Sequence, residues 1–214
     1  MKKPNIQLEI MDLKSIRLIP ENGAPEIATV SEKDGFFINA YRNDDFRIRA
    51  TVYDMMKKAQ KNLHKGYRFM VFETYRSFAK QEKLWQRTNQ QMREKYPDLP
   101  AAELQAICEN FTANPYDGIG SGHMAACAID LSLCDDAGKE FDMGTAMHEK
   151  SEKTRTETPL ITEEQRQRRH ILKKAMEDAG LINYPAEWWH FSYGDHQWAW
   201  LAGRKEAVYG ILDI

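Results

Sequence analysis

A carboxylate inside an apolar run constrains the fold of this chain more than any other feature. Residues 128–133 have the sequence Ala-Ile-Asp-Leu-Ser-Leu, in which Ile129, Leu131 and Leu133 occupy every second position. This alternation predicts a half-buried β-strand with Asp130 on the face opposite the three apolar side chains. An unpaired carboxylate beside a hydrophobic layer costs too much free energy to persist. Asp130 therefore needs a partner.

Two histidines are candidate partners for this carboxylate. His123 lies before Asp130 in the stretch Ser-Gly-His-Met-Ala-Ala-Cys-Ala-Ile-Asp, and His190 ends the sequence Glu-Trp-Trp-His far downstream. One His–Asp pair leaves both groups with unused ligand capacity. We therefore interpret His123, Asp130 and His190 as three metal ligands with an open fourth position. The alternative for His190 is a hydrogen-bonded core histidine, because aromatic residues flank it.

Glu187 lies three positions before His190. In a regular strand the two side chains would point to opposite faces, so a turn or a bulge at Trp188-Trp189 has to bring them together. Beside a metal-bound water, Glu187 would act as a general base. Two histidines and a carboxylate also suit non-haem iron oxygenases. Glu187 favours hydrolysis, because an oxygenase needs no base at that position.

Composition excludes several classes of function. The net charge of -2 over 214 residues gives no electrostatic footprint for nucleic acid or an anionic membrane. No window approaches the ~18 to 20 apolar residues of a membrane span. The three cysteines lack the spacing of a disulfide framework, which predicts reduced thiols. The sequence Met1-Lys-Lys-Pro-Asn-Ile lacks the apolar run of a signal peptide, so we expect a cytoplasmic protein.

One domain is expected over residues 1–214, of which 42% are hydrophobic. We predict an α+β fold in which an antiparallel sheet carries the metal site and helices pack on its other face. Residues 78–112 predict a helical insertion, because the proline-containing break at 97–100 divides two polar helical stretches. Residues 1–48 form a segment of uncertain structure, in which 6–10 alternate like a short strand.

These motifs together resemble the D-alanyl-D-alanine dipeptidase family of zinc peptidases, which is related to zinc DD-carboxypeptidases and to the hedgehog-type fold. The resemblance runs from about Asp45 to Tyr209. Besides the Ser-x-His, Ala-x-Asp and Glu-x-Trp-His motifs, it includes Glu73-Thr-Tyr-Arg76-Ser, Asp142-Met-Gly-Thr145 and the stretch from Asn183 to Asp195. No single motif is specific, but the joint pattern is.

The resemblance implies one zinc ion per chain, held by His123, Asp130 and His190. It also implies that Glu187 is the base and proton shuttle. Two further roles follow from the resemblance: Arg76 would stabilise the oxyanion and Ser121 would help to hold the substrate. The chemistry of arginine agrees with its role, because a guanidinium is always charged and can bind an anionic centre through two N–H groups. A surface arginine after a strand is the alternative for Arg76.

The leading prediction is zinc-dependent hydrolysis of D-Ala-D-Ala or a similar small dipeptide, with neither nucleic acid nor membrane as a partner. One alternative is a DD- or LD-carboxypeptidase or endopeptidase that acts on longer peptidoglycan peptides, which would require export. Another is a catalytically inactive metal-binding interaction module, which would need neither Glu187 nor Arg76. The sequence does not indicate an oligomeric state.

Two positions depart from the family pattern. Ala126 occupies a position where the family usually has glycine. Met147-His148 occupies the position where the best-known members have Phe-Asp, whose carboxylate helps to bind the substrate's amino terminus. We expect a weaker preference for a free amino terminus here, with Glu149 and Asp195 as possible substitutes for that carboxylate.

Overall fold

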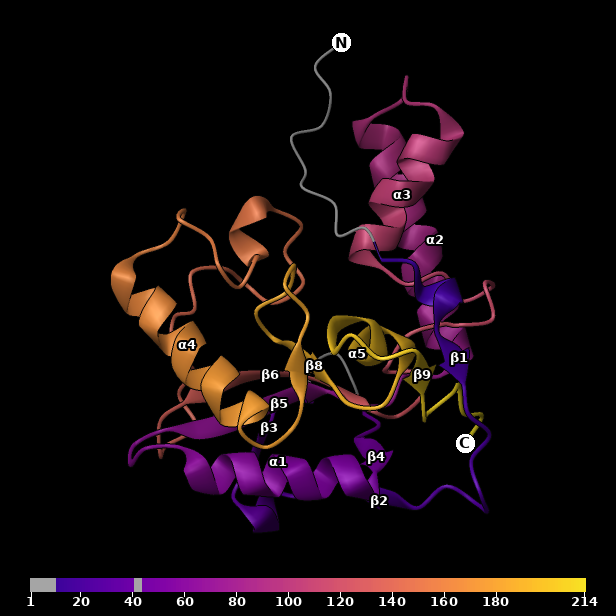
Figure 1. Ribbon diagram of the computed structural model, residues 1–214. Helices are drawn as coiled ribbons and strands as arrows, with labels where there is room; N and C mark the ends of the chain where they lie inside the picture. Colours follow the sequence, from indigo (N-terminus) through magenta and orange to yellow (C-terminus); the bar gives the residue numbers. More distant parts are fainter. Residues whose placement is uncertain (1–10, 41–43) are drawn as a thin grey trace.

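The computed structural model describes residues 11–40 and 44–214. Its centre is a five-stranded sheet in the order β3-β5-β6-β8-β7 (Figure 1). The strands are β3 (Phe37–Ile38), β5 (Arg68–Glu73), β6 (Ala128–Cys134), β8 (His190–Ser192) and β7 (Ile182–Asn183). The β3–β5 pair is parallel and the other three pairs are antiparallel. The predicted α+β fold with a mainly antiparallel sheet is confirmed.

Two helices, α1 (Ala50–Asn62) and α4 (Glu163–Glu177), contact each other and pack on this sheet (Figure 1). A capping box formed by Thr162 and Gln165 begins α4. The apolar side chains of β6 share one buried cluster with those of the two helices: Ile129, Leu131 and Leu133 with Val52, Met56, Leu172 and Met176. This cluster is the main core, and it fixes one face of β6.

The prediction that β6 is half-buried is wrong. All seven of its residues are buried. The reason is its central place in the sheet, between β5 and β8, together with the polar groups that cover its second face. On that face Asp130 lies within ion-pair distance of His123, His148 and His190. The second face of the central strand is therefore the floor of a site and not a solvated surface.

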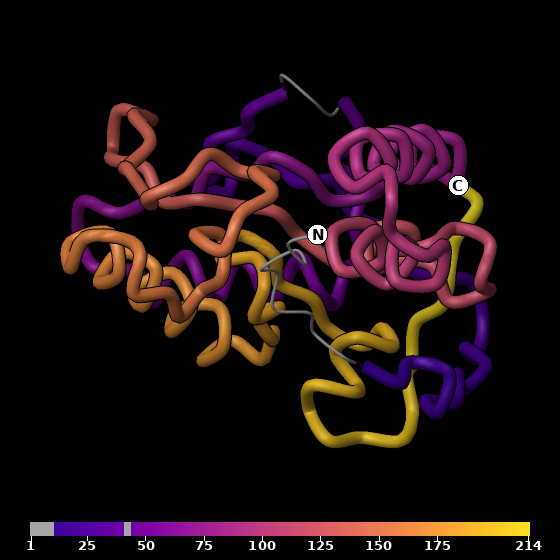
Figure 2. Tube along the Cα trace, turned by 90° about the horizontal axis from the view of Figure 1, so that it is seen from above, coloured from indigo at the N-terminus to yellow at the C-terminus, as the bar shows by residue number. Residues whose placement is uncertain are grey.

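The helices expected within 78–112 form a hairpin of α2 (Phe78–Lys95) and α3 (Ala101–Phe111). The two lie side by side and project away from the sheet (Figures 1 and 2). The hairpin has a small apolar cluster of its own, formed by Met92, Leu104, Ile107 and Cys108. Its packing is therefore separate from the main core.

The remaining elements are short: η1 (Leu13–Ser15), β1 (Arg17–Leu18), β2 (Ile27–Thr29), η2 (Glu32–Asp34), β4 (Arg47–Arg49), η3 (Glu152–Thr154), α5 (His196–Leu201) and β9 (Glu206–Ala207). β1 pairs with β9 in parallel, and β2 pairs with β4 antiparallel. The alternation over residues 6–10 lies outside the described residues. Within the described ranges, none of the helices has both the length and the apolar character that crossing a membrane requires.

A tight loop before β6 delivers His123. The backbone N–H groups of Cys127 and Ala128 both donate to the carbonyl of Gly122, at 2.9 and 3.1 Å. Ala126 adopts the left-handed conformation with a φ of 52°. Glycine adopts this conformation without the steric cost that a Cβ brings, so the structure explains why a glycine suits this position.

A side chain at Gly122 is expected to destabilise the fold. A Cβ added there would lie 2.3 Å from Oδ2 of Asp195 and 2.8 Å from the Cβ of Ala128. Asp195 also caps α5 by accepting from the N–H of Trp198 at 2.7 Å. Gly122→Ala should therefore lower the free energy of unfolding by about 1–3 kcal/mol, the usual cost of overpacking. Denaturant titration of the metal-free protein measures this.

Gly118→Ala is the matched control, because Gly118 lies in the same region and its added Cβ meets nothing within 4 Å. This control measures the cost of its positive φ alone, about 1–2 kcal/mol, which Gly122 does not bear. Equal unfolding midpoints for Gly122→Ala and wild type would contradict the packing described for the loop.

Candidate active site

The strand register of the sheet brings three side chains of the site together. Glu73 of β5 and His190 of β8 are the direct cross-strand neighbours of Asp130 in β6. Directly opposed residues on neighbouring strands present their side chains on the same face. Three ionisable side chains from distant parts of the sequence thus form one row across the centre of the sheet.

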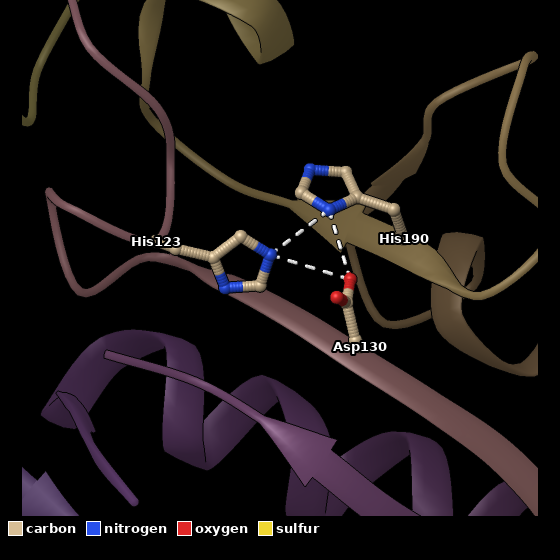
Figure 3. A group of neighbouring side chains, drawn as sticks. All are labelled: His123, Asp130 and His190. Carbon is tan, nitrogen blue, oxygen red and sulfur yellow. Dashed lines mark hydrogen bonds and ion pairs between the residues drawn. The ribbon is translucent and has the colours of Figure 1, made fainter. Parts of the chain in front are cut away.

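His123 joins this row from the loop that precedes β6. Its Nδ1 lies 2.7 Å from the carbonyl oxygen of Thr74. A carbonyl only accepts hydrogen bonds, so Nδ1 carries the proton and Nε2 presents a lone pair. That lone pair faces Asp130 and His190 (Figure 3). The backbone of Thr74 therefore sets both the ring orientation and the tautomer of His123.

The three predicted ligands meet at one point. Nε2 of His123 lies 3.3 Å from Oδ1 of Asp130 and 3.1 Å from Nδ1 of His190. Nδ1 of His190 lies 3.0 Å from the same Asp130 oxygen. A tetrahedral ion with bonds of about 2.0–2.1 Å needs ligand atoms roughly 3.3 Å apart. The residues present therefore fit a metal ion with two nitrogen ligands and one oxygen ligand.

The charge of the site also favours a cation. Burial alone would raise the pKa of Asp130, but the His123 and His190 rings hold the pKa of this carboxyl well below its usual range. Asp130 is 1% exposed, so water does not screen its charge. A buried carboxylate that stays ionised beside two histidines is a suitable ligand set for a divalent metal.

Glu187 reaches this site through a turn. The N–H of His190 donates to the carbonyl of Glu187 at 3.2 Å, which closes a tight turn through Trp188 and Trp189. The turn expected from the spacing of Glu187 and His190 is therefore present. Burial raises the pKa of the Glu187 carboxyl to about 7, with Asp130 adding to the shift and His190 opposing it. A carboxyl with such a pKa can accept and release a proton near neutrality.

Arg76 lies at the end of β5, at the edge of the same site. Its Nε and Nη2 donate to the two oxygens of Glu73 at 2.8 and 2.6 Å, and Nη1 donates to Oε1 of Gln81 at 2.8 Å. Burial alone would lower the pKa of Arg76, but the Glu73 carboxylate raises it above its usual value. The surface-arginine alternative is wrong, because Arg76 is 8% exposed.

A cavity of about 510 Å³ connects these groups. It is lined by the three predicted ligands and by Arg76, Ser121, His148, Tyr184, Glu187 and Asp195, and it extends to α3 and η1. Ser121 lies beside Gln81, to whose Oε1 its hydroxyl donates at 3.3 Å. The site residues expected from the sequence therefore line a single cavity.

The two proposed substitutes for the missing carboxylate differ in placement. Glu149 is exposed and accepts a hydrogen bond from the Ser151 hydroxyl at 2.6 Å. Asp195 lines the cavity, but its Oδ1 caps α5 and its Oδ2 accepts from the Cys127 thiol at 3.5 Å. Both carboxylates already have partners within the protein.

The sequence indicates no role for two site residues, Glu73 and His148, although Met147-His148 stands out as a departure from the family pattern. Glu73 forms an ion pair with Arg76, which lies three positions later, so the sequence does show the two residues close together. His148 has a left-handed backbone with a φ of 61°, and its Nε2 lies 3.7 Å from Oδ2 of Asp130. No periodic pattern signals an isolated residue of this kind in a loop.

Comparison with known proteins agrees with this geometry. A family model described as D-ala-D-ala dipeptidase matches residues 46–205. The chain is 34% identical over 108 residues to a D-alanyl-D-alanine dipeptidase of Synechocystis sp., covering 42% of this chain and 44% of that protein. It is 28% identical over 126 residues to the D-alanyl-D-alanine dipeptidase of Escherichia coli, covering 59% and 55%.

A D-alanyl-D-alanine dipeptidase of Enterococcus faecalis is 32% identical over 101 residues, which cover 47% of this chain and 46% of the relative. The chain spans about half the length of the curated relatives that it matches. The family model, by contrast, covers most of the chain, from the end of the N-terminal segment through α5. This chain therefore belongs to the D-Ala-D-Ala dipeptidase family of metallopeptidases.

Proposed function

We propose that this protein is a zinc-dependent dipeptidase that hydrolyses D-Ala-D-Ala or a similar small dipeptide. The observation that supports this most directly is the cluster of His123, Asp130 and His190, whose ligand atoms lie 3.0–3.3 Å apart on the floor of a cavity. The names of the relatives support the substrate class. Two nitrogens and one oxygen suit zinc in a catalytic site with one open position.

In this proposal each residue has one task. Bound zinc supplies Lewis acidity and lowers the pKa of a coordinated water toward neutrality. Glu187 takes the proton of the attacking water and passes it to the leaving amino group. Arg76 lies at the cavity edge with its charge fixed by Glu73, and it stabilises the negative charge that develops on the substrate oxygen. Ser121 helps to orient the substrate.

The pair of Arg76 and Glu73 suits this role. Glu73 occupies two of the guanidinium's N–H groups and Gln81 a third, which holds the planar group in one orientation. A preorganised donor needs no rearrangement when charge develops in the transition state. An inactive metal-binding module, the alternative from another class, needs neither this pair nor Glu187.

The metal ligands give the first test. His123→Ala and His190→Ala should each lose most of the bound zinc, and wild type should contain one zinc ion per chain, because three ligands are the minimum for a catalytic zinc site. Elemental analysis of the purified proteins measures this. His170→Ala is the matched control, since His170 lies on α4 with half of its side chain exposed. Unchanged zinc content in both ligand variants would rule out the proposed site.

Glu187 separates metal binding from chemistry. Glu187→Ala should retain the zinc but lose turnover by about 10² to 10⁴, the usual contribution of a general base. Zinc content and kcat for D-Ala-D-Ala are measured together. Glu157→Ala serves as the control, because Glu157 is exposed and pairs with His170 on the surface. A Glu187→Ala variant as active as wild type would assign Glu187 a structural role.

The amino end of the substrate gives a third test. Both Glu149 and Asp195 have partners within the protein, and His148 offers no negative charge to an ammonium group. The ratio of kcat/KM for D-Ala-D-Ala over its N-acetyl form should therefore fall well below the ~10⁴ of a site built to pair that group. Efficient cleavage of the free dipeptide with complete rejection of the acetylated one would show that a carboxylate does bind the ammonium.

A further inference from the structure

The segment between β6 and α4 holds His148 in an unusual backbone conformation. His148 and Ala126 are the non-glycine residues with positive φ among the described residues, and His148 has the larger value, 61°. A left-handed backbone at a residue with a Cβ costs free energy and persists only where the surroundings hold it. Such residues gather at functional sites, so the position calls for a physical explanation.

Contacts on both sides hold this segment over the site. The His148 ring lies against the Trp189 ring, with centroids 5.6 Å apart and a tilt of 57°. Two residues further on, Nζ of Lys150 donates to Oγ1 of Thr88 at 2.9 Å and to Oε1 of Gln91 at 3.0 Å, both on α2. The segment is thus anchored to the core below and to the helical hairpin beside it.

The imidazole of His148 faces the oxygen of Asp130 that the other two histidines do not. Oδ1 of Asp130 is the atom near His123 and His190, whereas Nε2 of His148 lies 3.7 Å from Oδ2. This distance is longer than a hydrogen bond and within ion-pair range. The two oxygens of Asp130 therefore face different groups: Oδ1 faces the candidate metal site and Oδ2 faces His148.

A second metal ion is a poor explanation for this arrangement. Ligand atoms of Glu73, Asp130 and His148 do lie within 4.8 Å of one another. Both oxygens of Glu73 already accept from Arg76, at 2.8 and 2.6 Å. The buried guanidinium thus already pairs with the Glu73 carboxylate that a second cation would need, and two like charges this close repel strongly.

We propose that His148 is a positioning residue for Asp130. In this proposal Nε2 of His148 carries a proton and attracts Oδ2 electrostatically across 3.7 Å, so that Oδ1 is the oxygen turned toward His123 and His190. Groups that orient a metal-ligating side chain typically change metal affinity by about 10- to 100-fold when removed. The inference rests on the proposed metal site, and it adds a residue that acts on the metal through Asp130 without contacting it.

Two variants of similar size test the donor itself. His148→Gln keeps an N–H group at about the reach of Nε2, whereas His148→Met fills similar space without a donor. Both residues bear the same cost of the left-handed backbone, so strain cancels in the comparison. Competition with a chromophoric chelator should show zinc affinity about 10- to 100-fold weaker for His148→Met and within about 3-fold of wild type for His148→Gln.

A spectroscopic readout accompanies the affinities. Visible absorption of the Co²⁺-loaded proteins reports ligand geometry, and it should change in His148→Met but stay close to wild type in His148→Gln. His148→Gly guards against a misfolded variant, because glycine relaxes the backbone and still removes the donor. His170→Met on the surface of α4 is the control for loss of a histidine elsewhere.

Each outcome decides the matter. Zinc binding by His148→Met or His148→Gly as tight as by wild type overturns the positioning role while leaving the proposed function intact. Equal losses in His148→Gln and His148→Met also overturn it, because the donor would then be irrelevant. A wild-type protein that binds no zinc overturns the proposed function and this inference together.

Discussion

The burial of one ionised carboxylate, Asp130, is the constraint on which the rest of the structure depends. The residue is placed at the centre of the sheet, where the chain has its largest core on one side. A charge in that position is costly unless partners surround it. Strand register supplies His190, a tight loop supplies His123, and an anchored segment supplies His148. Each of these three local structures places a histidine next to Asp130.

Charge balance extends the same logic along β5. Glu73 is the cross-strand neighbour of Asp130, so two carboxylates lie side by side on one buried face. Arg76 compensates for Glu73 through two charge-assisted hydrogen bonds, and Asp130 is left to its histidines. Burial alone would raise the pKa of Glu73, yet Arg76 lowers it to about 2. Of these two adjacent carboxylates, Glu73 is therefore neutralised by Arg76, and only Asp130 remains available to the histidines.

The sequence was sufficient for part of this arrangement. Residue types and motif spacing predicted that His123, Asp130 and His190 meet, and a turn was expected at Trp188-Trp189 because a strand could not bring Glu187 to His190. Alternation in β6 predicted a strand correctly and its burial wrongly. A period of two is the same whether the polar face meets water or other polar side chains, so only the tertiary structure distinguishes them.

The roles of His148 and of Glu73, the partner of Arg76, could not be predicted from the sequence, for different reasons. The Glu73–Arg76 pair depends on both side chains turning to one side at the end of β5, which spacing alone does not require. The role of His148 depends on a left-handed backbone that its local sequence does not require, since glycine is the usual residue in that conformation. Both contacts are decided by tertiary packing, and such contacts leave no local pattern.

The pairing of β1 with β9 has a consequence for the order of folding. Arg17 and Glu206 lie 189 positions apart in sequence, yet they are direct neighbours across this pair and form an ion pair. The adjoining η1 is one wall of the cavity. Contacts of such long range form slowly, whereas β5, β6 and β8 are closer together in sequence. Pairing of β5, β6 and β8, which brings Asp130 and His190 together, therefore need not wait for the β1–β9 pair to close this wall.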